Sequence, residues 1–65
     1  MKYYEVVRIY YTLGGAQFVH ANTFTHISDN QPISTTKQGR RGYICKDYFA
    51  DPVEAEDFRQ TALNA

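Results

Sequence analysis

Residues 2–15 are KYYEVVRIYYTLGG, a run of β-branched and aromatic residues that ends in two glycines. Such side chains fit the pleated, half-buried surface of a sheet, so the run predicts a long strand over residues 2–12. The paired glycines supply the positive φ that a tight hairpin turn requires. We therefore expect a return strand over residues 16–25 and a hairpin between the two.

The two faces of the first strand differ in composition. Alternation places an odd-numbered set on one face and an even-numbered set on the other, and we predict the odd-numbered set to be the core face: Tyr3, Glu5, Val7, Ile9 and Tyr11. Neither face of the return strand is uniformly apolar. A bulge near Ala21 and Asn22 is one interpretation, and it would place Phe18 and Phe24 on different sides.

A second hairpin is predicted after a loop of turn-forming residues at 28–32. Its strands are expected over residues 33–36 and 42–49, on either side of a basic tip, Lys37-Gln38-Gly39-Arg40-Arg41.

A helix start is indicated by Asp51-Pro52-Val53-Glu54, which combines an N-cap residue, a proline at the first helical position and a glutamate suited to a capping box. We expect the helix to span residues 52–64. Ala55, Phe58 and Ala62 recur at helical spacing and should pack on the sheet, with Phe58 as the anchor. The order of elements predicts an α+β fold with a small antiparallel sheet of three to four strands covered by one C-terminal helix.

Length and composition set the class of protein. The 65 residues suit one small domain over 1–65, and its core is expected to be thin at this length. No apolar run is long enough for a membrane span, and no secretory signal is apparent, so we expect a cytoplasmic protein without membrane contact. The single cysteine excludes an internal disulfide.

Charge is balanced in sum and uneven along the chain. Residues 1–46 hold six basic and two acidic residues, a balance of +4, and residues 47–65 hold one basic and five acidic residues, a balance of −4. This distribution predicts a basic sheet surface opposite an acidic helix. Ordinary charge pairing across a small surface is the alternative interpretation.

Three groups of residues are candidates for partner binding. An even-numbered stripe on the first strand combines tyrosine with arginine, which interfaces concentrate: Tyr4, Arg8 and Tyr10. The basic hairpin is suited to phosphate contacts through Lys37, Arg40, Arg41 and the adjoining Tyr43. Two helix carboxylates, Glu56 and Asp57, are candidates for mimicry of a phosphate track, although acidic residues near a helix start are favoured without any partner.

Metal and catalytic interpretations find little support. His20, His26 and Cys45 do not have the paired spacing of a zinc site, and no glycine-rich oxyanion turn adjoins the cysteine. We therefore expect no metal, no cofactor and no enzymatic activity.

The leading hypothesis is a small non-enzymatic binding protein that occupies a macromolecular partner, with a protein as the expected partner. Its profile is typical of inhibitors of host proteins carried by phages or other mobile elements. Nucleic-acid binding by the basic hairpin at residues 37–46 is the alternative. A homodimer through strand 2–12 is expected if that strand lies at the sheet edge.

Overall fold

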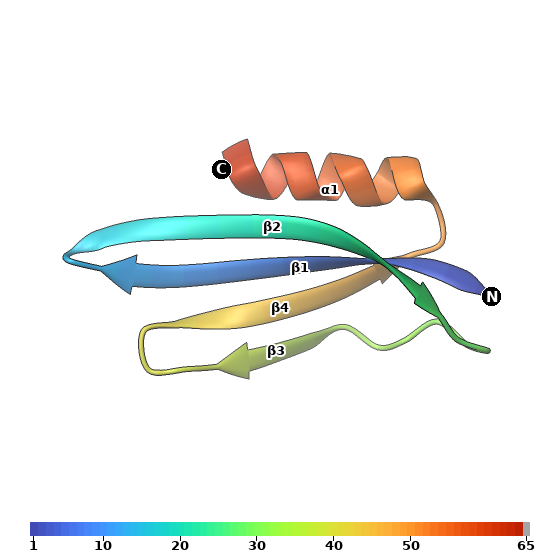
Figure 1. Ribbon diagram of the computed structural model, residues 1–65, viewed down its shortest axis with the longest axis horizontal. Helices are drawn as coiled ribbons and strands as arrows, with labels where there is room; N and C mark the ends of the chain where they lie inside the picture. The colour runs from blue at the N-terminus through green and yellow to red at the C-terminus, as the bar shows by residue number, and fades with distance from the viewer. Residues whose placement is uncertain (65) are drawn as a thin grey trace.

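The computed structural model describes residues 1–64 and shows a four-stranded antiparallel sheet with one helix packed against it (Figure 1). The predicted α+β fold of two hairpins and a C-terminal helix is confirmed. The elements are β1 (Lys2–Leu13), β2 (Ala16–Ile27), β3 (Thr35–Gln38), β4 (Gly42–Phe49) and α1 (Pro52–Asn64), and the spatial strand order is β2-β1-β4-β3.

The third strand begins two residues later than predicted and ends at Gln38 instead of residue 36. The basic tip is correspondingly short. The Gly39 amide donates to the Gly42 carbonyl at 2.8 Å, so that the loop proper consists of Arg40 and Arg41. Strand pairing therefore extends into the segment that the sequence suggested to be a loop.

β1 lies in the interior of the sheet, with β2 on one side and β4 on the other. The expected homodimer through strand 2–12 is therefore wrong, because the backbone groups of that strand are already paired within the chain. The edge strands are β2 and β3. The Nη1 of Arg59, on α1, lies 3.5 Å from the Ala21 carbonyl in the edge strand β2.

The β1–β2 hairpin turns at Gly14 and Gly15, whose φ angles of 59° and 81° lie in the region that favours glycine. Its register is continuous from Leu13 opposite Ala16 to Lys2 opposite Ile27. The proposed bulge near Ala21 is therefore absent. Without an extra residue, Phe18 and Phe24 stay on the same face of the sheet.

The helix covers the even-numbered face of β1, which corrects the prediction that the odd-numbered face is the core face. Val6, Ala21 and Cys45 lie on the covered face and are buried, as are Ala55 and Ala62 of the helix. The physical reason is size: small side chains on both sides let the helix approach the sheet closely. On the odd-numbered face of β1, Tyr3 is buried as well.

The helix begins as the sequence predicted. The Asp51 carboxylate accepts a hydrogen bond from the Val53 amide at 2.9 Å, which makes Asp51 the N-cap. Thirteen residues give a helix about 20 Å long, whereas the molecule is 41 Å long. Both hairpin turns therefore extend past the C-terminal end of α1, at the same end of the molecule (Figure 1).

Candidate binding surface

The second face of the sheet has no element packed over it among residues 1–64, where α1 contacts the opposite face. We call it the open face. Its exposed apolar residues include Phe18 at 44%, Phe24 at 53% and Ile44 at 37% exposure. Large apolar residues gathered on one exposed face commonly mark an interaction surface.

Three rings on the open face are stacked in a row. The Tyr11 ring lies 5.2 Å from that of Phe18 and 5.6 Å from that of His20, with interplanar angles of 18° and 12°. The Tyr11 hydroxyl is also 3.0 Å from Nε2 of His20. The register explains this row, because Tyr11 is directly opposite Phe18 and diagonal to His20. The three rings hold one another in place.

A hollow of about 270 Å³ lies beside this row, at the start of β4. Gly42 is opposite Tyr11 in the register and lines the hollow. The hollow is lined on the open face by Ile9, Tyr11, Ile44 and Lys37, with Arg41 also contributing.

Gly42 is required for close strand packing as well. A Cβ at this position would lie 1.8 Å from the Tyr10 carbonyl oxygen, so no other residue fits without a backbone shift. The Thr12 amide donates a hydrogen bond to the Arg41 carbonyl at 2.9 Å, which continues the pairing of β1 with β4 toward the turns. The two hairpins are therefore joined up to their tips.

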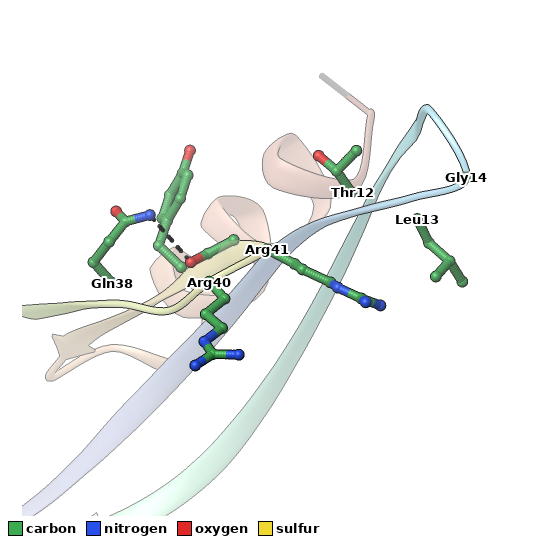
Figure 2. A pocket seen from close by; sticks show the side chains of 8 residues that line it. Thr12, Leu13, Gly14, Gln38, Arg40 and Arg41 are labelled. Atoms are coloured by element: carbon green, nitrogen blue, oxygen red, sulfur yellow. Dashed lines mark hydrogen bonds between the residues drawn. The ribbon is translucent and has the colours of Figure 1, made fainter.

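Basic side chains surround the hollow. Lys37 and Arg41 line it, and Lys46 lies two residues beyond Ile44 on the same face of β4. Figure 2 shows the neighbouring pocket between the two turns, where Arg40 projects to the same side of the strands as Leu13, Thr12 projects to the other side and Arg41 extends across β1. Among residues 1–64, the ion pairs involve only Arg8 with Asp47 and Arg59 with Glu56. These four cations are therefore unpaired.

The acidic residues lie mostly on the other side of the molecule. Asp47 belongs to the helix face, and Glu54, Glu56 and Asp57 belong to α1. Glu5 is the open-face carboxylate, and it accepts a hydrogen bond from the Tyr48 hydroxyl at 2.7 Å. The structure thus separates a basic sheet face from an acidic helix, as the charge distribution along the sequence indicated.

The two helix carboxylates proposed for phosphate mimicry differ in their surroundings. Glu56 accepts hydrogen bonds from Arg59 at 2.7 and 3.0 Å and from Gln60 at 3.1 Å. These bonds lower the pKa of the Glu56 carboxyl from its ordinary 4.5 to about 2. Its charge is compensated within the helix. Asp57 is exposed, and its carbonyl accepts a hydrogen bond from Thr61.

The predicted stripe of Tyr4, Arg8 and Tyr10 lies on the helix face. Arg8 is held there by Asp47 and by the Tyr10 hydroxyl, which accepts a hydrogen bond from Nη1 of Arg8 at 3.2 Å. Tyr10 stacks on Tyr43 at 4.8 Å, beside the hairpin tip. The side chains of these residues therefore belong to the helix face of the sheet and not to the open face.

Polar contacts order part of the open face at the end away from the turns. The rings of His26 and Tyr48 meet at 5.5 Å, and the side chain of Gln31, in the connection after β2, donates to the Tyr48 carbonyl at 2.9 Å. The hydrogen bond to Glu5, together with desolvation, raises the pKa of the Tyr48 phenol above its ordinary value. Phe24, opposite Glu5 in the register, stays 53% exposed at this end of the open face.

The residues considered for metal binding or thiol chemistry are divided between the two faces. His20 and His26 lie on the open face, whereas Cys45 lies on the helix face with its Sγ 3.6 Å from the Thr36 hydroxyl. In the described part of the chain, no group of three or more His, Cys, Asp and Glu residues is placed to hold a metal ion. The helix of the described chain is neither long nor apolar enough to cross a membrane.

Sequence reasoning did not identify Tyr11, Phe18, Phe24 and Ile44 as surface residues. The signal was present in the alternation of the first hairpin, because a two-residue turn makes Tyr11 and Phe18 cross-strand neighbours. The prediction that the odd-numbered face is the core face placed Tyr11 in the interior instead.

Searches of protein-family models, curated proteins and solved structures found no match to this chain.

Proposed function

We propose that this chain is a non-enzymatic binding protein that occupies a macromolecular partner through the open face of its sheet. The observation that carries the proposal is the set of exposed apolar side chains on a face that α1 does not cover, with Phe24 at 53% exposure. A domain with so thin a core gains from a partner that covers this face. Binding itself is the proposed activity, as in an inhibitor that blocks its target.

The placement of the reactive side chains supports a non-enzymatic role. A thiol needs a base within hydrogen-bond distance to act as a nucleophile. Cys45 and His20 lie on opposite faces of the sheet, so the histidine does not activate the thiol. The Cys45 side chain is instead buried on the helix face of the sheet.

One observation favours nucleic acid over a protein as the partner. Lys37 and Lys46 lie on the open face itself, and Arg40 and Arg41 form the turn next to it. Protein interfaces are generally depleted in lysine, whereas phosphate contacts are made by lysine and arginine. The zero net charge of the chain does not oppose this, because the acidic residues are mostly on the helix side.

Affinity capture from a cell lysate tests the general proposal. The open-face variant carries Phe18→Ser with Phe24→Ser, and the control is Val53→Ser on the helix, where Val53 is 65% exposed. The three proteins should have the same circular dichroism spectrum, because none of these side chains belongs to the buried core. We expect the wild type and the control to recover the same stoichiometric partner and the open-face variant to lose it. Equal recovery by the open-face variant would contradict the proposal.

A further inference from the structure

We infer that the hollow at Gly42 binds a nucleobase of single-stranded nucleic acid and that the surrounding cations bind the phosphates of the same strand. This inference rests on the proposed function and assigns the partner its chemical class. It depends on the shape of the hollow, on the aromatic ring at its wall and on the charge around it.

The size of the hollow is suited to a single base. At about 270 Å³ the hollow is below the range of pockets that enclose drug-sized molecules. It is open to solvent on the open face, so a chain of linked nucleotides can pass over it and insert one base. Its apolar side chains, Ile9 and Ile44, offer contacts to a flat ring without a competing carboxylate.

The wall of the hollow includes an immobilised aromatic ring. The Tyr11 ring is held by its contacts with Phe18 and His20, and its hydroxyl lies within hydrogen-bond distance of Nε2 of His20. A ring that is already ordered loses little side-chain entropy when a base packs against it. Phe18 is 44% exposed and offers a second surface for the adjacent base.

The charge beside the hollow is suited to a phosphate backbone. Lys37 and Arg41 line the hollow, Arg40 lines the neighbouring pocket at the turns, and Lys46 follows Ile44 on the same face of β4. Among residues 1–64 none of these four forms an ion pair with a carboxylate. Phosphates can therefore bind them without displacing an existing partner.

The arrangement favours a single strand over a duplex. Bases of a duplex are already stacked and cannot enter a hollow on a sheet, whereas unpaired bases can stack on exposed rings. Double-stranded nucleic acid would contact only the four cations.

The inference is tested by fluorescence anisotropy with short labelled oligothymidylate, oligouridylate and a DNA duplex. We expect tighter binding to a single strand than to the duplex, and whichever of the two single strands binds more tightly identifies DNA or RNA as the ligand. With four phosphate contacts, the affinity should fall with salt at a log-log slope of about −3. Equal affinity for single strand and duplex would overturn the inference.

Two pairs of variants locate the site. Tyr11→Leu should weaken single-strand binding about tenfold, whereas Tyr11→Phe, which keeps the ring, should bind like the wild type. Lys37→Gln should reduce the salt slope by about 0.7, whereas Lys2→Gln, the same charge change on the other face, should leave it unchanged. Equal effects of Lys37→Gln and Lys2→Gln would show nonspecific attraction and overturn the site.

The capture experiment separates this inference from the proposed function. If no oligonucleotide binds at low salt and the open-face variant still loses a nuclease-resistant protein partner, the nucleobase site is wrong and the binding function stands. If no oligonucleotide binds and the open-face variant loses no partner of either kind, both are wrong.

Discussion

Arg8 and Asp47 form an ion pair between neighbouring strands β1 and β4, with Nη2 of Arg8 2.9 Å from Oδ2 of Asp47. The Arg8 guanidinium also lies 4.7 Å from the centre of the Phe58 ring on α1. One side chain thus connects two strands to the helix. The two charged side chains are 24% and 22% exposed, so the pair is largely shielded from solvent.

Removing the carboxylate of this pair should destabilise the fold. Asp47→Asn is expected to lower the free energy of unfolding by about 2 kcal/mol, because the shielded guanidinium loses its anion. Urea denaturation measures the effect. Asp29→Asn, the same chemical change in an exposed loop, is the control and should have little effect. If Asp47→Asn and Asp29→Asn unfold at the same urea concentration, the ion pair contributes nothing to the stability of the fold.

Phe58 should be the anchor of the helix. Its ring contacts that of Phe49 at 5.1 Å and the Arg8 guanidinium, so it joins α1 to both β1 and β4. We expect Phe58→Ala to lower the free energy of unfolding by about 3 kcal/mol. Val53→Ala truncates an exposed residue of the same helix and should be nearly neutral. Thermal unfolding monitored by circular dichroism measures both, and equal melting temperatures would contradict the assignment.

Gly42 and Gly39 form a matched pair of glycines in one hairpin. A Cβ at Gly42 would lie 1.8 Å from the Tyr10 carbonyl oxygen, whereas one at Gly39 would lie 3.4 Å from the Gly42 carbonyl oxygen. Gly42→Ala should therefore cost about 2 kcal/mol or more, and Gly39→Ala much less. Hydrogen exchange of the β4 amides should show faster opening in the first variant alone. Similar exchange in the two variants would mean that the strands do not approach as closely as described.

Glu56 should give the fold a specific acid sensitivity. Hydrogen bonds from Arg59 and Gln60 lower the pKa of Glu56 from 4.5 to about 2 in the folded chain. A carboxylate with a depressed folded-state pKa stabilises the fold above its unfolded pKa, and this stabilisation is lost as the pH falls from about 4.5 to about 2.

The measurement is the free energy of unfolding as a function of pH. Glu56→Gln should reduce the loss of stability over this pH window, while Asp57→Asn, on the adjacent residue, should leave the loss as in the wild type. The effect should be small because the pair is on the surface, and it should weaken in high salt. An unchanged pH profile in Glu56→Gln would contradict the prediction.

Local signals account for the elements themselves. The two glycines at 14 and 15, the strand-forming run before them and the Asp51-Pro52 helix start each act within a few residues of sequence. The element types and most of their bounds followed from these signals. The predicted bounds of the third strand were two residues too early. Its bounds depend on pairing with β4, and no local signal in residues 33–38 specifies that pairing.

The candidate surface was predicted only in part. Lys37, Arg40 and Arg41 stand out in the sequence as a basic cluster at a turn, and the structure places them beside the hollow. The aromatic residues Tyr11 and Phe18 beside the hollow were not predicted to be at the surface, because tyrosine and phenylalanine are equally common in a core. Burial is a property of what packs over a side chain, and the sequence of a strand does not contain that information.

The sequence by itself determined that the chain would form two hairpins followed by a capped helix, because turn conformation and capping depend on neighbouring residues. Only the tertiary structure decided that β1 is central and that the helix covers the even-numbered face. Both outcomes depend on contacts between distant segments, chiefly those of α1 with β1 and β2, where Val6, Ala21, Ala55 and Ala62 are buried. Because α1 covers that face, Phe18 and Phe24 on the other face stay exposed, and the open face is the consequence.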